Sequence, residues 1–375
     1  MSGTPPISIS RYHVRQLGAR YEKDDNLAAT INDVAKLAGV SPKTVSNVIH
    51  DYPHVRTSTR VRVVQAIETL GYQPNIAARS LVTKRHNLIG FILWDILNPG
   101  YTEMVEIIIA RAREQGYMLI VGNAGRDPEE EERMATLLIQ QQVDGIILAS
   151  ATRESKVPDL LAAAGVPVVM VSRHIKDDQA DYVVTDNVKG GYMVTRHLIG
   201  LGHRRIAFVR GTPGASTSED REEGYRQALQ DHGLEYDETL SACGNYTSRG
   251  AYLAARELLS RDPRPTALVC ANDLMAIAVI DAVIDSELRV PEDVAVTGYD
   301  DIAWAASRSL ALTTVNGGAD LMAQGAVQIL LQRIRKEIVG APRHVVLPPE
   351  LVVRRTCGAS LPRQAKPIPL AMDMI

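Results

Sequence analysis

Carboxylate, amide and guanidinium side chains recur just after predicted strands, in positions suited to binding a polyhydroxylated ligand. The residues concerned are Asp95, Asn98, Arg173, Asn272 and Asp300, together with Arg221, which we expect to open a helix after a further strand. In parallel sheets the ligand-binding edge is formed by the carboxyl ends of the strands. An aromatic ring of Tyr101, Tyr246 or Trp304 would cover the apolar face of a sugar. Asp and Asn at strand ends are also common helix caps, and that alternative stays open.

The sequence contains no set of residues typical of catalysis or of a bound cofactor. There is no GxxxxGK[ST] loop, no HExxH pair and no GxSxG elbow with suitable partners. The nine histidines lack metal-ligand spacing. We therefore predict no enzyme activity, no cofactor and no metal. Three distant cysteines, no apolar run of membrane-spanning length and no secretory h-region in the first 25 residues predict a cytoplasmic protein.

The elements that would position these side chains alternate between apolar strands and amphipathic helices from residue 88 onward. Strands are predicted at residues 88–93, 118–121, 145–149, 168–171, 205–209, 267–270 and 294–298. Helices are predicted at residues 102–115, 129–142, 188–200 and 273–286. Continuous Val- and Ile-rich strands separated by helices indicate parallel sheets covered on both faces. Some 285 residues of this pattern predict two similar α/β lobes with a ligand cleft between them.

A second candidate site lies near the N-terminus, in two short helices joined by a tight turn over residues 31–50. Ser41 followed by Pro42 is a typical start for the second helix. If Val45, Val48 and Ile49 face inward, the free face presents Pro42, Lys43, Ser46, Asn47 and His50. Lys43 can donate to guanine and Asn47 can pair with adenine, whereas Thr44 and Arg60 suit phosphate. A three-helix bundle with solvated polar faces is the alternative.

The charge distribution favours nucleic-acid binding at this end of the chain. The whole sequence has a formal net charge of −3. Residues 26–90, however, contain eight basic and only three acidic side chains. A basic head on an acidic body places a phosphate-binding surface near the N-terminus.

Several motifs then occur in a fixed order. They are TINDVAKLAGVS at residues 30–41, YQPN at 72–75, AARSL at 77–81, DILNP at 95–99, DREEGY at 220–225, AND at 271–273 and GYDD at 298–301. In this order they resemble the lactose-repressor (LacI/GalR-type) family of bacterial transcriptional regulators, and the match continues to about residue 355. Gly100, where the family usually has an aromatic residue, and Asn316-Gly317-Gly318, usually closer to Asn-Gln-Pro, depart from the pattern.

The resemblance implies an α/β fold class with an N-terminal all-α helix-turn-helix headpiece and a two-lobed, periplasmic-binding-protein-like core of parallel sheets. The expected domains are a mobile tail (1–28), the headpiece (29–73), a hinge helix and linker (74–87), the core (88–356) and a C-terminal tail (357–375). The core divides into an N-terminal lobe of residues 88–186 and 316–343 and a C-terminal lobe of residues 187–315 and 344–356.

The resemblance also implies roles for individual residues. Residues 75–81 would fold as a hinge helix on the operator, with Leu81 wedged between base pairs. The implied DNA-binding residues are Ser41, Pro42, Lys43, Thr44, Asn47, Arg60, Asn75, Ala78 and Leu81. The implied effector-binding residues are Asp95, Asn98, Tyr101, Arg173, Arg221, Tyr246, Asn272 and Asp300. Arg173 favours a sugar effector over a purine, and reading a near-palindromic operator requires a homodimer.

Two other classes remain as alternatives. A periplasmic sugar-binding protein would share the core but needs a signal peptide and has no use for residues 30–81. A doubly wound enzyme would need a nucleophile, base or phosphate loop that the sequence does not show. Salt-sensitive DNA binding without turnover of a bound sugar would discriminate these classes. The identity of the effector, the operator, and whether the effector releases or strengthens DNA binding are left open.

Overall fold

The computed structural model describes residues 29–49, 52–72, 86–175 and 179–359. The chain divides into two compact units, Met1–His86 and Asn87–Ile375. In the described part of the chain, no helix is both long enough and apolar enough to cross a membrane.

In the described residues of the first unit there are three helices, α1 (Ile31–Ala38), α2 (Pro42–Ile49) and α3 (Thr57–Leu70). Thr30 and Asp33 cap α1 reciprocally, and Gly39 ends it in the left-handed conformation, which glycine adopts without strain. The core of this unit contains Val34, Ala35, Ala38, Val45, Val48, Val63 and Ala66. Val61 on α3 is exposed, because the buried stripe of this helix is centred on Val63 and Ala66.

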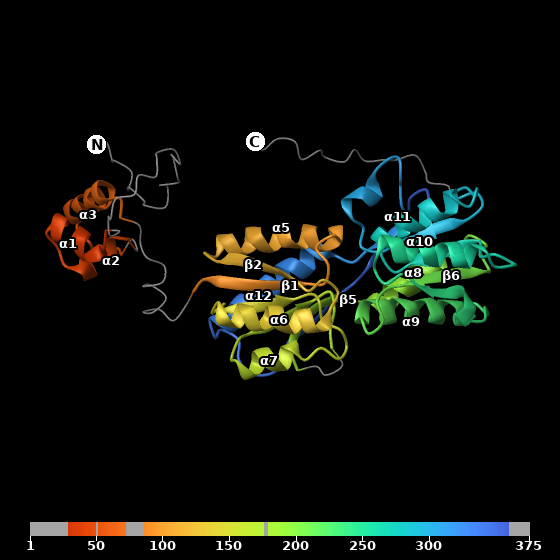
Figure 1. Cartoon of the computed structure of the whole chain (residues 1–375), viewed down its shortest axis with the longest axis horizontal. Helices are drawn as coiled ribbons and strands as arrows, with labels where there is room; N and C mark the ends of the chain where they lie inside the picture. The colour runs from red at the N-terminus through yellow and green to blue at the C-terminus, as the bar shows by residue number, and fades with distance from the viewer. Residues whose placement is uncertain (1–28, 50–51, 73–85, 176–178, 360–375) are drawn as a thin grey trace. The chain divides into compact units, whose positions relative to one another are not determined.

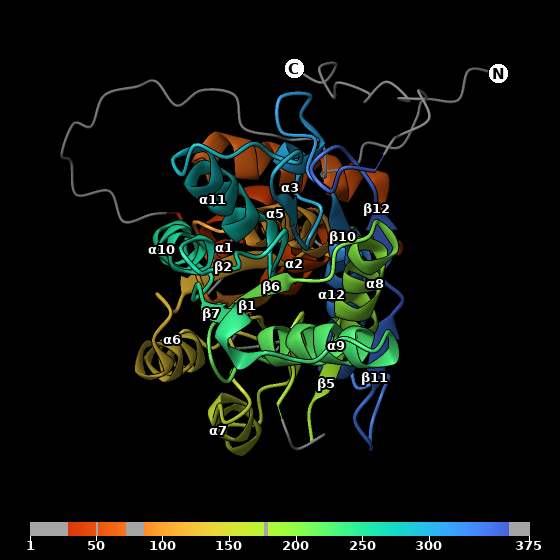
Figure 2. The ribbon, with the colours of Figure 1, turned by 90° about the vertical axis from the view of Figure 1, so that its right-hand side faces the viewer.

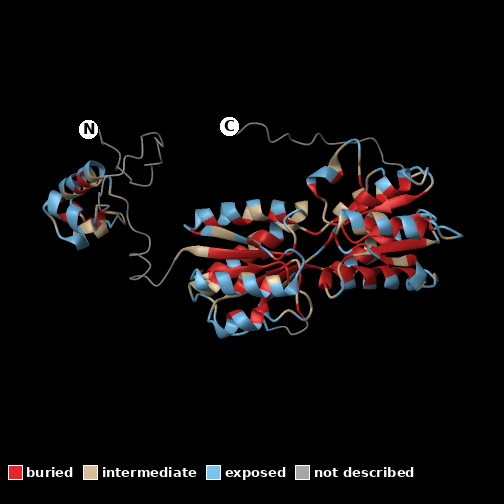
Figure 3. Cartoon of the chain, in the orientation of Figure 1, coloured by how far each residue is buried: buried red, intermediate tan, exposed pale blue. Residues whose placement is uncertain are grey.

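The N-terminal lobe of the second unit is built on a six-stranded parallel sheet with the order β11-β5-β4-β3-β1-β2. Its strands are β1 (Leu88–Leu93), β2 (Met118–Asn123), β3 (Gly145–Leu148), β4 (Val168–Val171), β5 (Asp181–Thr185) and β11 (His344–Leu347). Helices α5 (Pro99–Glu114) and α12 (Ala319–Ile334) cover one face, and α6 (Pro128–Gln140) and α7 (Val157–Ala163) cover the other (Figure 1). The central strands are fully buried, as expected for a sheet covered on both faces (Figure 3).

The C-terminal lobe repeats this design around a four-stranded parallel sheet with the order β7-β6-β8-β9. Its strands are β6 (Ile206–Arg210), β7 (Ser241–Cys243), β8 (Ala267–Cys270) and β9 (Ala295–Thr297). Helices α8 (Asn187–Gly200) and α9 (Ser216–Asp231) pack side by side on one face, and α10 (Ser248–Leu259) and α11 (Asp273–Ile284) on the other (Figure 2). Two short 3₁₀ helices, Glu238–Leu240 and Ala303–Ala306, and the antiparallel pair β10 (Thr314–Asn316) and β12 (Glu350–Val352) complete the lobe.

The chain crosses between the lobes three times, after β5, between β10 and α12, and between β11 and β12. One expected boundary is wrong. We assigned residues 344–356 to the C-terminal lobe, but β11 pairs with β5 in the sheet of the N-terminal lobe, with Val345 opposite Val183. The last crossing therefore follows Leu347. Strand β11 forms the edge of this sheet, where its backbone pairs with β5 on one side and its side chains are only partly buried.

Candidate ligand-binding site and nucleic-acid interface

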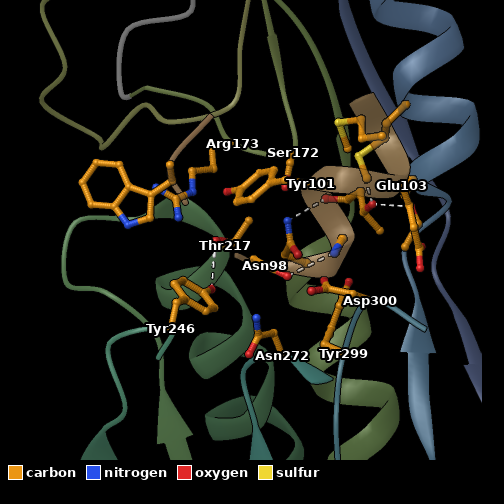
Figure 4. Close-up of a pocket in the computed structure, with 18 of the residues that line it drawn as sticks. Asn98, Tyr101, Glu103, Ser172, Arg173, Thr217, Tyr246, Asn272, Tyr299 and Asp300 are labelled. Carbon is orange, nitrogen blue, oxygen red and sulfur yellow. Dashed lines mark hydrogen bonds between the residues drawn. The ribbon is translucent and has the colours of Figure 1, made fainter. Parts of the chain in front are cut away.

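A pocket lies between the two lobes, at the carboxyl ends of their strands. It has an empty volume of about 760 Å³, which includes space open to solvent. The structure brings together all eight residues that we expected around a ligand, namely Asp95, Asn98, Tyr101, Arg173, Arg221, Tyr246, Asn272 and Asp300. Figure 4 shows Arg173 and Tyr101 on one side of the pocket, with Tyr246, Asn272 and Asp300 facing them from the other.

Arg173 forms part of the wall from the N-terminal lobe. It follows β4 and Ser172, and its side chain is almost completely buried. Its Nη1 donates to the carbonyl oxygen of Ser150 at 3.1 Å, and its guanidinium lies over the rings of Trp94 at 5.0 Å and Tyr246 at 5.7 Å. Its Nε has no hydrogen-bond partner among the described residues. A buried, charged donor is therefore left with spare capacity beside the pocket.

Arg221 is the opposing cation in the C-terminal lobe, and its donors are largely used within the protein. Its Nε donates to Asn187 Oδ1 at 2.8 Å, and its Nη1 donates to the carbonyl oxygen of Ala271. The guanidinium also lies 3.5 Å from the centre of the Tyr299 ring and pairs with Asp300 at 3.4 Å. We expected Arg221 to open its helix, but α9 begins five residues earlier, at Ser216. Its role is to organise this wall and to hold Asp300.

Asp300 follows β9 in an unusual backbone conformation, with φ at 111°. Its side chain is about one quarter exposed. Burial raises the pKa of Asp300 to about 6, and the nearby Arg221 opposes that rise. Asp273, directly beneath, is fully buried and accepts hydrogen bonds from Thr314 Oγ1 and the Ile302 amide. Asp273 therefore supports the loop that carries Asp300.

The two asparagines of the site are helix caps as well as pocket residues. Asn98 Oδ1 accepts a hydrogen bond from the Gly100 amide at the start of α5, and Asn272 Oδ1 accepts one from the Met275 amide at the start of α11. Both residues also line the pocket. The Nδ2 of Asn272 is buried and unpartnered in the described part of the chain. The helix-cap alternative therefore holds for both asparagines, and their role in ligand binding stays a prediction.

Aromatic rings supply the apolar part of the lining. Tyr101 donates its hydroxyl to the Ala149 carbonyl oxygen at 3.2 Å, and Tyr246 donates to Thr217 Oγ1 at 2.9 Å. Burial raises the pKa of both phenols, so both stay neutral and act as donors. Trp304, our third candidate, is 61% exposed and does not line the pocket.

Other lining residues were missed from the sequence. They are Trp94, Glu103, Met104, Thr185, Asn187, Thr217, Tyr299, Ala319 and Met322. Trp94 and Tyr299 directly precede the expected Asp95 and Asp300, so their position in the same loops was a usable signal. Asn187 follows β5, a strand that we did not predict.

The first unit presents the residues expected to contact DNA on α2 and α3. Ser41 Oγ accepts a hydrogen bond from the Thr44 amide at 3.2 Å and so caps α2. Pro42 and Lys43 are exposed, and Asn47 is half-buried. Arg60 Nη2 donates to the Tyr52 carbonyl oxygen at 3.0 Å, which ties α3 to the loop before it. The expected hinge residues Asn75, Ala78 and Leu81 lie outside the described residues.

Comparison with known proteins agrees with this architecture. A model of bacterial regulatory proteins of the lacI family matches residues 30–75, and one of a periplasmic binding protein-like domain matches residues 195–357. The HTH-type transcriptional regulator CelR of Thermobifida fusca is 39% identical over 334 residues, which cover 87% of this chain and 98% of CelR.

Two solved structures match most of the chain. A transcriptional regulator CelR–cellobiose complex has a TM-score of 0.68 and 37% identity, over 88% of this chain and 99% of the other. A lac repressor dimer bound to operator and the anti-inducer ONPF has a TM-score of 0.79 and 29% identity, over 89% of this chain and 100% of the other.

A helix-turn-helix unit joined to a two-lobed core with a pocket between the lobes defines a DNA-binding regulator controlled by a small molecule. The chain belongs to the LacI family of bacterial regulatory proteins. It is a transcriptional regulator and not an enzyme.

Proposed function

We propose that this protein is a homodimeric repressor whose affinity for a near-palindromic operator is controlled by a sugar bound between the lobes of its core. We also propose a cytoplasmic location, because a bacterial repressor has to reach its operator DNA there. One headpiece reads only a half-site, so a pair of chains is required for a two-fold operator. The match to a lac repressor dimer on its operator supports this arrangement.

The observation that carries the sugar assignment is a set of buried donors without partners around the pocket. Among the described residues, Arg173 Nε, Asn272 Nδ2 and Trp94 Nε1 are buried and unpaired. Leaving such a group unsatisfied costs about 1–3 kcal/mol, so a ligand that supplies acceptor oxygens is favoured. The carboxylates of Asp95 and Asp300 accept hydrogen bonds and suit the hydroxyl protons of the same ligand.

The aromatic lining fits the same ligand class. A sugar ring has an apolar C–H face, and the rings of Tyr101 and Tyr246 offer buried apolar surface beside the polar groups. The CelR structure that matches this chain is a cellobiose complex. Together these features favour a saccharide over a wholly apolar effector.

On the DNA side, we propose that Lys43 and Asn47 contact base edges in the major groove. Thr44 and Arg60 would contact phosphate, Ser41 and Pro42 would lie against the DNA at the start of α2, and Asn75, Ala78 and Leu81 would contact the minor groove. The support is the exposure of Lys43 at the first turn of α2 and the position of Asn47 one turn further along the same helix.

A thermal-shift screen tests the proposal directly. The panel contains cellobiose, glucose, ribose, galactose, maltose and xylose, and binding to DNA selected from a random pool is measured with and without each sugar. A sugar at a hundredfold excess over its Kd stabilises the folded protein by about 2.7 kcal/mol. We expect one member to raise the melting temperature and to change DNA affinity. A protein that binds DNA but responds to no saccharide would overturn the sugar assignment.

A further inference from the structure

A second set of contacts joins the two lobes beside the pocket, and its residues do not line the pocket. Arg153 lies in the loop after β3 of the N-terminal lobe. Its Nε donates to Glu219 Oε2 at 3.1 Å, and its Nη2 pairs with Asp220 Oδ1. Glu219 and Asp220 lie in the first turns of α9 in the C-terminal lobe. An ion-pair network therefore bridges the two lobes.

The backbone and a neighbouring histidine extend these contacts. The Arg153 amide donates to the Gly214 carbonyl oxygen at 2.7 Å, and the His174 amide donates to Ser216 Oγ at 3.1 Å. The His174 Nε2 lies 3.4 Å from Asp220 Oδ2. Two separate loops of the N-terminal lobe thus meet the start of one helix of the C-terminal lobe.

The position of these residues in the sequence connects them to the pocket. His174 directly follows Arg173, and Asp220 directly precedes Arg221. Thr217, another pocket residue, lies one turn earlier on α9. Any shift of α9 relative to the loop that carries Arg153 would therefore also change the separation of Arg173 from Arg221.

We propose that the Arg153–Asp220 pair is an interlobe latch that positions the pocket and raises sugar affinity without touching the sugar. The inference rests on the proposed function, because it concerns the affinity of that same pocket. The side chains of Arg153 and Asp220 are only 17% and 20% exposed, so solvent screens their attraction less than that of a surface pair. Glu219, at 49% exposure, contributes less.

The latch acts by stabilising the closed arrangement of the lobes. Because the bound sugar contacts both lobes, any free energy that favours their closed arrangement also favours the bound state. An uncharged sugar should consequently bind with an affinity that depends on ionic strength. A residue with a purely packing role would not produce that dependence.

The experiment measures sugar affinity by calorimetry in the full-length protein, using the panel member that most stabilises the wild type. We expect Arg153→Gln and Asp220→Asn each to weaken binding about tenfold, since either removes the attraction between the two partly buried charges that join the lobes. The double variant should be no weaker than the single variants. The charge-reversed pair Arg153→Asp with Asp220→Arg should recover part of the loss. Arg133→Gln is the matched control, because it removes an arginine paired with Glu130 inside one helix.

The outcomes separate the latch from the sugar assignment. Wild-type affinity should fall several-fold between 50 mM and 1 M NaCl, and that fall should be absent in Arg153→Gln. Wild-type binding that is insensitive to salt, or unchanged affinity in both single variants, would overturn the latch alone. A wild type that binds no saccharide in the panel would overturn the proposed function and the latch together. The salt series on the wild type needs no variant to fold.

Discussion

At the scale of single residues, Asn272 combines two roles through two different atoms. Its Oδ1 caps α11, and its Nδ2 is a buried donor without a described partner. Asn272→Ser should keep an oxygen that caps α11 but lose the amide donor Nδ2, whereas Asn272→Ala should lose both groups. We expect Asn272→Ala to lower the free energy of unfolding by about 1 kcal/mol relative to Asn272→Ser. Both variants should weaken sugar binding to a similar extent. Chemical denaturation and calorimetry on the pair check this, and full sugar affinity in the serine variant would mean that the amide is only a cap.

The second residue prediction concerns pH. A sugar hydroxyl that donates to Asp300 requires the ionised carboxylate, and burial raises the pKa of Asp300 to about 6. Protonation therefore competes with the sugar as the pH falls through 6, and affinity should be constant above about pH 7. At pH 5 about one tenth of the carboxyl groups are ionised, so the affinity should be about tenfold lower. Asp300→Asn should bind more weakly at pH 7 and show little change down to pH 5. A flat wild-type profile from pH 5 to 8 in calorimetry would rule out this role.

At the scale of elements, α2 and α3 are expected to contribute to DNA binding in different ways. Asn47→Ala should cost about 1–3 kcal/mol on the preferred operator and relax preference at one base position. Arg60→Ala should weaken binding to all DNA sequences to a similar degree. Part of this effect should come from the loss of the hydrogen bond that Arg60 donates to the Tyr52 carbonyl oxygen. Selection from random DNA with each variant measures both effects. If Asn47→Ala returns the same motif as the wild type, Asn47 does not read a base.

The contact between α8 and α9 also positions the pocket. Gly191 and Gly224 let the helices approach closely, since a Cβ on Gly224 would overlap the Val188 carbonyl oxygen and one on Gly191 would overlap that of Arg221. This approach allows Arg221 on α9 to reach Asn187 on α8. Gly224→Ala should cost about 1–3 kcal/mol of stability and also weaken sugar binding. Gly200→Ala, with open space around its Cβ, is the control for thermal denaturation and calorimetry. Equal behaviour of the two variants would show that the close contact is not needed.

Strong periodicity and motif order made much of this architecture predictable. The seven predicted strands all occur, because each has a continuous apolar run; most of these strands are buried, whereas β2 at the sheet edge is largely exposed. Strands β7, β10 and β12 were missed because they are only three residues long, and β11 because it is half-exposed at a sheet edge. Strand β5 was missed because the apolar run between Asp181 and Thr185 is only three residues long. The eight expected pocket residues lie together because strand ends in parallel sheets converge. The partners of Arg221 were not predictable, because Asn187 and Asp300 lie 34 and 79 positions away from it in the sequence. The Arg153–Asp220 pair was not predictable, because its two residues belong to different lobes.

At the scale of the whole molecule, the sugar and the operator should influence each other to the same degree. Typical couplings of about 1–3 kcal/mol correspond to a change in affinity of about 5- to 150-fold. The factor by which the sugar changes operator affinity should equal the factor by which operator DNA changes sugar affinity, in either direction. Fluorescence anisotropy with labelled DNA gives the first factor and calorimetry on the protein–DNA complex gives the second. A sugar that binds with the same affinity to free and DNA-bound protein would be a ligand without a regulatory effect.

The double role of the capping residues has a consequence for anyone who wishes to retune this protein as a biosensor. Positions such as Asn98 and Asn272 start helices, and Arg221 holds its lobe together, so libraries at these positions would lose folded members before new specificities are sampled. Met104, Met322 and Ser172 also line the pocket, and among the described residues none of them caps a helix or joins an ion pair, although both methionines are buried and Thr185 Oγ1 donates to Met322 Sδ at 3.5 Å. Mutagenesis aimed at these three positions should therefore yield the larger share of folded sensors with altered responses.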